Sequence, residues 1–290
     1  MIKRPRTLKT LRRLIDGVDD NLHDLVMQRF DLVAEVGQAK REEKVAAEVP
    51  AREAEILRRL LGRHRGNFPA GALVRMWREM VGAAISLQAD FSVAVAVTEA
   101  DRGTWDLARD HYGSQVPMTA YRSAAELMRG LAESKASVGV VPIPGDSAED
   151  GWWRALAGSG NGWRVTARLP FAGRGNARGS SEAFVLGRPG AAPSGAVRSL
   201  FAIEMRGEQS RGGLVSMLAD GAVPATLLAL SRASPGISAG LIEIDDHVLP
   251  DDGRLQNMLA SLSDRLAHVA SLGIYARPIT ATDVGAAKQD

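Results

Sequence analysis

The first third of the chain carries its apolar residues at helical spacing. From residue 8 to residue 44 they recur at steps of three, four or seven, the stripe of a long helix packed along a bundle. The stripe consists of Leu8, Leu11, Ile15, Val18, Leu22, Leu25, Leu32 and Val36. Similar spacing predicts a second helix over about 50–64, with Pro50 in its first turn, and a third over about 70–89. The first 90 residues are therefore predicted to be all helical.

After Asp90 the pattern changes to short apolar runs bounded by Gly and Pro, which are typical of strands. Strands are predicted at 93–97, 137–143 and 182–187. Helical patterns at 104–112 and 123–134 separate the first two strands, and this order predicts a β-α-β unit. Residues 145–181 and 188–196 are rich in Gly, Ser and Pro, so we expect loop or linker there.

The last segment, about 198–278, mixes both patterns and is predicted to be α+β. Its expected strands lie near 199–205, 225–230 and 239–245, and its expected helices near 211–221 and 253–270. The chain is therefore predicted to be multidomain, with an all-α domain at 1–90, an α/β segment with linker at 91–196 and an α+β domain at 197–290.

Composition narrows the classes of function. With 45% hydrophobic and 24% charged residues the 290-residue chain is typical of a globular protein. It has no apolar run long enough to span a membrane and no apolar region after its basic start, so we expect a cytoplasmic protein with no membrane partner. The absence of cysteine excludes disulfides, a thiolate nucleophile and Cys-ligated zinc, and the five histidines lack metal-ligand spacing.

Charge is unevenly distributed along the chain. Residues 1–89 hold 17 Lys and Arg against 12 Asp and Glu, whereas the net charge of the whole chain is only +2. A basic segment suits nucleic acid or a small polyanion. Aromatic residues make up 5% of the chain and do not interleave the basic ones, so we expect no nucleic-acid surface. A small anion is the better match.

Two cations lie on one face of the first predicted helix. Arg29 and Lys40 are eleven residues apart, so they fall within about 20° of each other around the axis and can bracket a small anion. Arg12 lies about 25 Å from Arg29 along the axis and on another face. If Arg12 serves the same kind of site, it must serve that of a neighbouring chain, which points to an intertwined dimer.

The helical third resembles the all-helical class of chorismate mutases. The resemblance rests on LRRLIDGVDDNLHDLVMQRFDLVAEVGQAK (11–40), PAREAEILRRL (50–60) and VRMWREMVGAAISLQ (74–88), in the family's order and relative spacing. It implies a homodimer of three-helix chains with two shared active sites. It also implies chorismate as the small-molecule substrate, its rearrangement to prephenate in aromatic amino-acid biosynthesis, and no metal or cofactor.

The resemblance assigns a role to each matching residue. Arg29 and, from the partner chain, Arg12 bind the substrate carboxylates, and Lys40 contacts a carboxylate and the ether oxygen. Gln88 donates to the same ether oxygen. Arg52 and Glu53 begin the second helix, and Glu53 receives the ring hydroxyl of the substrate. Arg29, Lys40 and Gln88 form the expected catalytic set.

These residue types suit a pericyclic rearrangement, which needs no nucleophile and no proton carrier. Arginines grip carboxylates in a bidentate manner and bring the reacting carbons together. Donors on the ether oxygen stabilise the charge that grows there as the C–O bond breaks. Two positions depart from the family pattern, since Val49 replaces an Asp and Ala84 replaces a Ser. Each change removes one hydrogen bond, so we expect weaker substrate binding with activity retained.

The order of the parts resembles the bifunctional chorismate mutase–prephenate dehydratase with its regulatory ACT domain. ASVGVVPI (136–143) matches the dehydratase, but the family's Glu-Asn-Ser is replaced by Pro144-Gly145-Asp146. Its Thr-Arg-Phe motif falls on Glu182-Ala183-Phe184, without the catalytic threonine. We therefore expect a degenerate, shortened and inactive dehydratase segment.

The last segment resembles an ACT domain. GGLV (212–215) and LSRA (230–233) stand where the family's effector-loop motifs would be. If an amino acid such as phenylalanine acts as effector, the resemblance places it at Gly212, Gly213, Leu214, Ser231 and Arg232. The alternative is a generic α+β module that holds the dimer together.

Two other functions remain open. An isochorismate pyruvate-lyase shares the helical fold and the shape of the substrate, although Gln88 and the full-length helices favour the mutase. A catalytically silent, ligand-sensing protein is the second alternative. The complete set of Arg12, Arg29, Lys40, Arg52, Glu53 and Gln88 argues against such loss in the helical third.

Overall fold

Three helices open the chain, as the spacing predicts. The computed structural model describes residues 6–98, 102–146, 151–158, 160, 162–179, 181–190, 193–221 and 223–280. The helices are α1 (Leu8–Glu43), α2 (Pro50–Arg63) and α3 (Ala70–Gln88). The hydroxyl of Thr7 caps α1 by accepting from the amide of Thr10, and Lys44 ends the helix in the left-handed conformation. Pro50 stands at the first position of α2, where its missing N–H costs nothing.

The chain divides into two compact units. One contains residues 1–47 and 84–90, and the other contains residues 48–83 and 91–290. Helix α3 therefore contributes its last turns to the first unit and the rest of its length to the second.

A five-stranded mixed sheet follows the helices, in the strand order β2-β1-β3-β5-β4. Its strands are β1 (Val93–Ala96), β2 (Met118–Tyr121), β3 (Val138–Pro142), β4 (Arg164–Leu169) and β5 (Ala183–Gly187). Strands β1 and β3 are parallel, with Val95 opposite Val140, and this confirms the predicted β-α-β unit. Helices α4 (Gly103–Tyr112) and α5 (Ala124–Ala132) both contact these two strands.

The prediction of loop over 145–181 was wrong in two places. Helix α6 (Trp152–Gly158) and strand β4 both lie within this segment, and β2 also was not predicted. Strand β4 alternates strictly between half-buried and buried side chains, with Val165, Ala167 and Leu169 facing the core. Because the surrounding Gly and Ser residues dominate the composition, this short alternation is hard to recognise from the sequence.

A four-stranded antiparallel sheet forms the last part of the chain. Its elements in chain order are β6 (Val197–Arg206), α7 (Arg211–Ala219), β7 (Ala225–Ser234), β8 (Ile237–Ile244), α8 (Gly253–Leu259) and β9 (Leu266–Ala276). The strand order β7-β8-β6-β9 with two helices is that of a split β-α-β fold. The predicted helix over 253–270 was too long, since α8 and a 3₁₀ turn (Ala260–Leu262) end before β9 begins.

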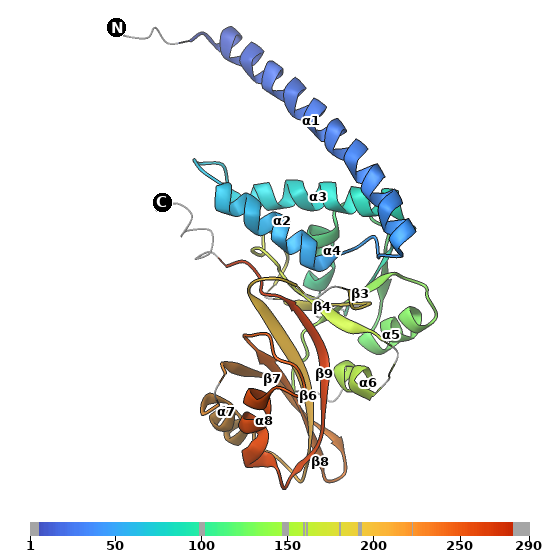
Figure 1. Cartoon of the computed structure of the whole chain (residues 1–290), viewed down its shortest axis with the longest axis vertical. Helices are drawn as coiled ribbons and strands as arrows, with labels where there is room; N and C mark the ends of the chain where they lie inside the picture. Colours follow the sequence, from blue (N-terminus) through green and yellow to red (C-terminus); the bar gives the residue numbers. More distant parts are fainter. Residues whose placement is uncertain are drawn as a thin grey trace, which may run out of the picture. The chain divides into compact units, whose positions relative to one another are not determined.

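Two hydrophobic clusters form the core of this part of the chain. Helices α7 and α8 cover one face of the four-stranded sheet (Figure 1). In the first cluster, Phe201 and Ile203 of β6 meet Leu214 of α7 and Leu255 of α8. The alternate residue Leu200 faces the second cluster, which also contains Trp153 of α6 and Phe184 of β5. This second cluster joins the two sheets, because β4 packs along β9.

Two structural features are absent from the described residues. None of their helices is long and apolar enough to cross a bilayer. The same part of the chain holds no group of three or more His, Asp or Glu side chains arranged to bind a metal ion.

Candidate functional site

Lys40 and Gln88, 48 positions apart in sequence, meet in the structure. The Lys40 Nζ donates to the Gln88 Oε1 at 3.4 Å and to the carbonyl of Ala47 at 2.6 Å. The Gln88 Nε2 donates to the carbonyl of Val33 at 3.4 Å. Both side chains are half-buried. The contact fixes which end of the Gln88 amide faces the lysine, and so orients its N–H donors.

A glycine on α1 makes this approach possible. Gly37 is the one buried residue of α1, and a β-carbon there would lie only 2.8 Å from Cγ of Gln88. No larger residue fits without moving the Gln88 side chain. Gly37 therefore lets the end of α3 lie close enough to α1 for Gln88 to reach Lys40.

Arg29 carries an unsatisfied donor on the same helix. Its Nη1 is buried and has no hydrogen-bond partner in the part of the chain that the structure describes. Burial lowers the pKa of the Arg29 guanidinium below its ordinary value, and the guanidinium lies 5.8 Å from the Phe30 ring centroid. An arginine keeps its charge under such a shift, so Arg29 offers a cationic donor to a ligand. Arg12 is exposed near the start of α1.

The second expected pair begins α2. Arg52 is exposed and forms an ion pair with Glu55 at 2.9 Å. Glu53 is buried, and its Oε2 accepts from the Nη1 of Arg78 on α3 at 2.7 Å. Val49, which replaces the family's aspartate, is the N-cap residue of α2 and offers no side-chain hydrogen bond. Ala84, which replaces the family's serine, is buried in α3.

A second carboxyl lies near Glu53. The Oε1 of Glu48 accepts from the Tyr112 hydroxyl at 2.9 Å. Burial and the repulsion of Glu53 raise the pKa of Glu48 to about 8, although the Tyr112 hydrogen bond and Arg78 act in the opposite direction. Glu48 is therefore largely protonated at neutral pH, and the positive charge of Arg78 is balanced by Glu53. Gly82 permits α3 to pack here, since a β-carbon would lie 1.9 Å from the Tyr112 carbonyl oxygen.

Replacing Glu48 with glutamine should change how stability depends on pH. The folded protein keeps the Glu48 proton up to about pH 8, whereas an unfolded chain with the ordinary pKa of 4.5 loses it. The stability that this proton provides is complete below pH 4.5 and is lost as the pH rises through 8. We expect Glu48→Gln to gain stability over wild type as the pH rises through this window, by a few kcal/mol at pH 8.

Urea unfolding from pH 5 to pH 8.5 measures this difference, with the exposed Glu43→Gln as a control that tracks wild type. An offset between Glu48→Gln and wild type that stays constant with pH would contradict the expected ionisation.

The expected effector residues lie on two neighbouring elements. Gly212, Gly213 and Leu214 are in the first turn of α7, where the amide of Gly213 donates to the Ser210 hydroxyl at 3.1 Å. Ser231 and Arg232 lie on β7, against which α7 packs. The Ser231 hydroxyl is buried and unpartnered among the described residues, and Arg232 forms an ion pair with Glu208.

The residues that the sequence did not single out are Arg78 and Tyr112. Arg78 lies four residues after Val74 and seven before Ile85, on the buried face of α3. A charged residue on an apolar stripe was the available signal for Arg78, because such a residue requires a buried partner. Tyr112 gives no comparable signal, since its partner Glu48 becomes apparent only when α4 packs beside the start of α2.

The helical part of the chain matches a known protein family. Residues 11–89 match the family of chorismate mutase type II, so these three helices form a domain of that type, and the predicted resemblance is confirmed. The bifunctional chorismate mutase/prephenate dehydratase of Aquifex aeolicus is 30% identical over 140 residues, which are 47% of this chain and 38% of that protein. The protein of the same description from Pseudomonas aeruginosa is 28% identical over 143 residues, with the same shares.

Both alignments are longer than the family match, so the similarity continues beyond the helical domain. The chain spans only 38% of the length of these curated relatives. Among solved structures, prephenate dehydratase from Streptococcus mutans has a TM-score of 0.45 at 13% identity, covering 65% of this chain and 98% of that one.

Proposed function

We propose that this protein is a chorismate mutase that rearranges chorismate to prephenate. The observation that carries the proposal is the contact between Lys40 and Gln88 at 3.4 Å, in a domain of the chorismate mutase type II class. The two side chains offer an ammonium and an amide donor side by side. These are the groups that an ether oxygen needs as its C–O bond breaks.

The arginines supply the second part of the proposed mechanism. Arg29, with its buried and unpartnered Nη1, binds one substrate carboxylate, and Arg12 of a second chain and Arg52 complete the binding of the dianion. Holding both carboxylates brings the reacting carbons together and lowers the entropic part of the barrier. Glu53 accepts the ring hydroxyl of the substrate while Arg78 holds its carboxylate in place.

The proposal includes a homodimer. The eight apolar residues of the α1 stripe are 41–63% exposed in the single chain. A continuous apolar face of this length is costly in water and is typical of an interface. A second copy of the same helix supplies a matching apolar face, and the same association would bring Arg12 to the site of the partner.

We also propose that the rest of the chain follows the predicted division, with a dehydratase-like segment at 91–196 and an ACT-like domain at 197–290. Glu182 stands at the position of the catalytic threonine and forms an ion pair with Arg168 at 3.1 Å, which supports an inactive dehydratase. The split β-α-β strand order and the unpartnered Ser231 hydroxyl support an ACT-like domain with an amino-acid effector.

The direct test is chorismate consumption by the purified full chain, with identification of the product. We expect prephenate to accumulate without phenylpyruvate, and phenylalanine to change the rate if the ACT-like domain binds it. Phenylpyruvate would show that the dehydratase segment is active. Untouched chorismate would refute the mutase, and pyruvate release from isochorismate would establish the lyase in its place.

A further inference from the structure

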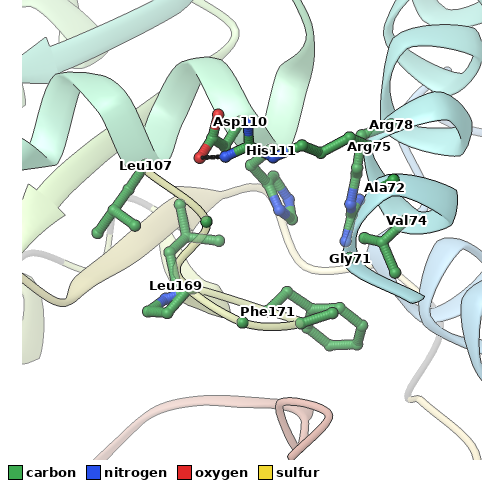
Figure 2. A pocket seen from close by; sticks show the side chains of 14 residues that line it. Gly71, Ala72, Val74, Arg75, Arg78, Leu107, Asp110, His111, Leu169 and Phe171 are labelled. Carbon is green, nitrogen blue, oxygen red and sulfur yellow. Dashed lines mark hydrogen bonds and ion pairs between the residues drawn. The ribbon is translucent and has the colours of Figure 1, made fainter. Parts of the chain in front are cut away.

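A cavity of about 360 Å³ lies between α3, α4 and the segment that follows β4 (Figure 2). Its apolar wall is formed by Val74, Leu107, Leu169 and Phe171. Its polar lining consists of Arg75, Arg78, Asp110 and His111. The volume lies in the range of small-molecule sites. Arg78 also holds Glu53, which is a proposed contact of the mutase substrate, whereas the other lining residues have no proposed role in the mutase or the ACT-like domain.

His111 is the first residue of the lining that suits a ligand. Its side chain is buried, with 7% of the residue exposed, and its ring points into the space between Leu107, Leu169 and Phe171 (Figure 2). Burial and the nearby Arg78 hold the pKa of His111 well below its ordinary value, so the imidazole is neutral. Among the described residues neither ring nitrogen has a hydrogen-bond partner, so both are open to a group inside the cavity.

Arg78 is the second residue of the lining that suits a ligand. The residue is only 4% exposed, and among the described residues it makes a single hydrogen bond, from Nη1 to Glu53. Its guanidinium lies 5.3 Å from the centroid of the Phe171 ring. A guanidinium has five N–H donors and Arg78 lines the cavity, so donors that Glu53 does not use remain for a ligand.

The lining is richer in donors than in acceptors. Arg75 donates to Asp110 at 2.5 Å and to the Asn176 side chain at 3.1 Å, so the one carboxylate of the lining is already used. Arg78 offers several N–H donors, and the neutral His111 ring offers one N–H donor and one acceptor nitrogen. A carboxylate supplies two acceptor oxygens and suits such a group. The opposite wall is apolar and aromatic, so it suits a hydrocarbon or aromatic body.

We propose that this cavity binds a small monocarboxylate with an aromatic body. The carboxylate lies against Arg78 and His111, and the ring packs against Leu107, Leu169 and Phe171. The proposal does not depend on the mutase activity, because none of these contacts involves the substrate of the mutase.

Calorimetric titration of the full chain with 3-phenylpropanoate at pH 7 tests the proposal. We expect saturable binding with one site per chain. The neutral analogue 3-phenylpropanamide should bind about tenfold more weakly or worse, because it lacks the charge that Arg78 recognises. Equal affinity for the two probes, or no saturable binding of the carboxylate, would overturn the proposal.

Two variants locate the binding site. Ala72→Trp fills the cavity from α3 and should abolish binding, whereas Met76→Trp on the exposed face of the same helix should leave it unchanged. His111→Leu keeps the bulk of the side chain and should weaken binding about tenfold. Thermal unfolding shows whether each variant is folded, and His111→Leu decides the matter if Ala72→Trp is not. Wild-type affinity in a folded Ala72→Trp or His111→Leu protein would place the probe elsewhere and overturn the proposal.

Discussion

Replacing Gln88 with alanine is expected to lower kcat for chorismate by about 10²–10³-fold. The amide donates to an oxygen on which charge grows only in the transition state, so its loss should reduce kcat far more than it raises KM. Steady-state kinetics of chorismate disappearance measure both parameters. The matched control is Gln38→Ala on α1, where the side chain is exposed and donates only to Glu42. We expect Gln38→Ala to keep wild-type kinetics, and wild-type kcat in Gln88→Ala would contradict the assigned role.

The same variant tests the shared site when it is mixed with Arg12→Ala. Each variant alone should be nearly inactive, because every site lacks either Gln88 or Arg12. If Arg12 comes from the partner chain, a mixed dimer contains one site with both changes and one intact site. When equal amounts of the two variants are refolded together, about half of the dimers are mixed and each has one intact site of two. The mixture should therefore recover about a quarter of wild-type activity. No recovery, with mixed dimers detected by mass, would show that both residues serve the site of their own chain.

Replacing Glu243 with alanine is expected to cost about 3–5 kcal/mol of unfolding free energy. Glu243 of β8 is buried and accepts from Arg168 at 2.6 and 2.7 Å, from Arg198 at 2.9 Å and from the Tyr275 hydroxyl. Arg168 lies on β4 of the other sheet, so the carboxylate joins the two sheets. Its removal leaves the buried Tyr275 hydroxyl without its acceptor, and leaves Arg168 and Arg198 with only Glu182 and Asp245 as partners among the described residues.

Urea unfolding followed by circular dichroism measures the loss. The control is Glu133→Ala, which breaks an exposed ion pair with Lys135 and should change stability by about 0.5 kcal/mol or less. If Glu243→Ala lowers the free energy of unfolding by no more than the control does, the arginines find other acceptors or water. The network then contributes little to joining the sheets.

Local pattern was sufficient for the elements that carry the chemistry. The 36-residue α1, with Arg29 and Lys40 on one face, follows from apolar spacing alone because a helix of this length repeats its signal many times. The β-α-β unit around β1 and β3 follows for the same reason, since its strands are short apolar runs between clear helical patterns. The proposed mutase residues were recognisable because they follow a family-specific order along three helices.

The shorter elements were ambiguous in the sequence. Strand β9 was partly assigned to a helix because its first residues continue the mixed pattern of α8, and only pairing with β6 makes them a strand. The strand order of either sheet depends on contacts between residues far apart in the chain, which periodicity does not encode.

The sequence by itself therefore determined which faces are apolar, where the long helices begin and end, and which side chains match a chorismate mutase. The tertiary structure decided which group lies against which. It placed Gln88 beside Lys40 across Gly37, Arg78 beside Glu53, and Tyr112 beside Glu48. It also placed His111 in the lining of a cavity, with no hydrogen-bond partner among the described residues. The physical reason is that periodicity shows that a face must be covered, whereas the partner that covers it is selected by packing and buried hydrogen bonding between distant segments.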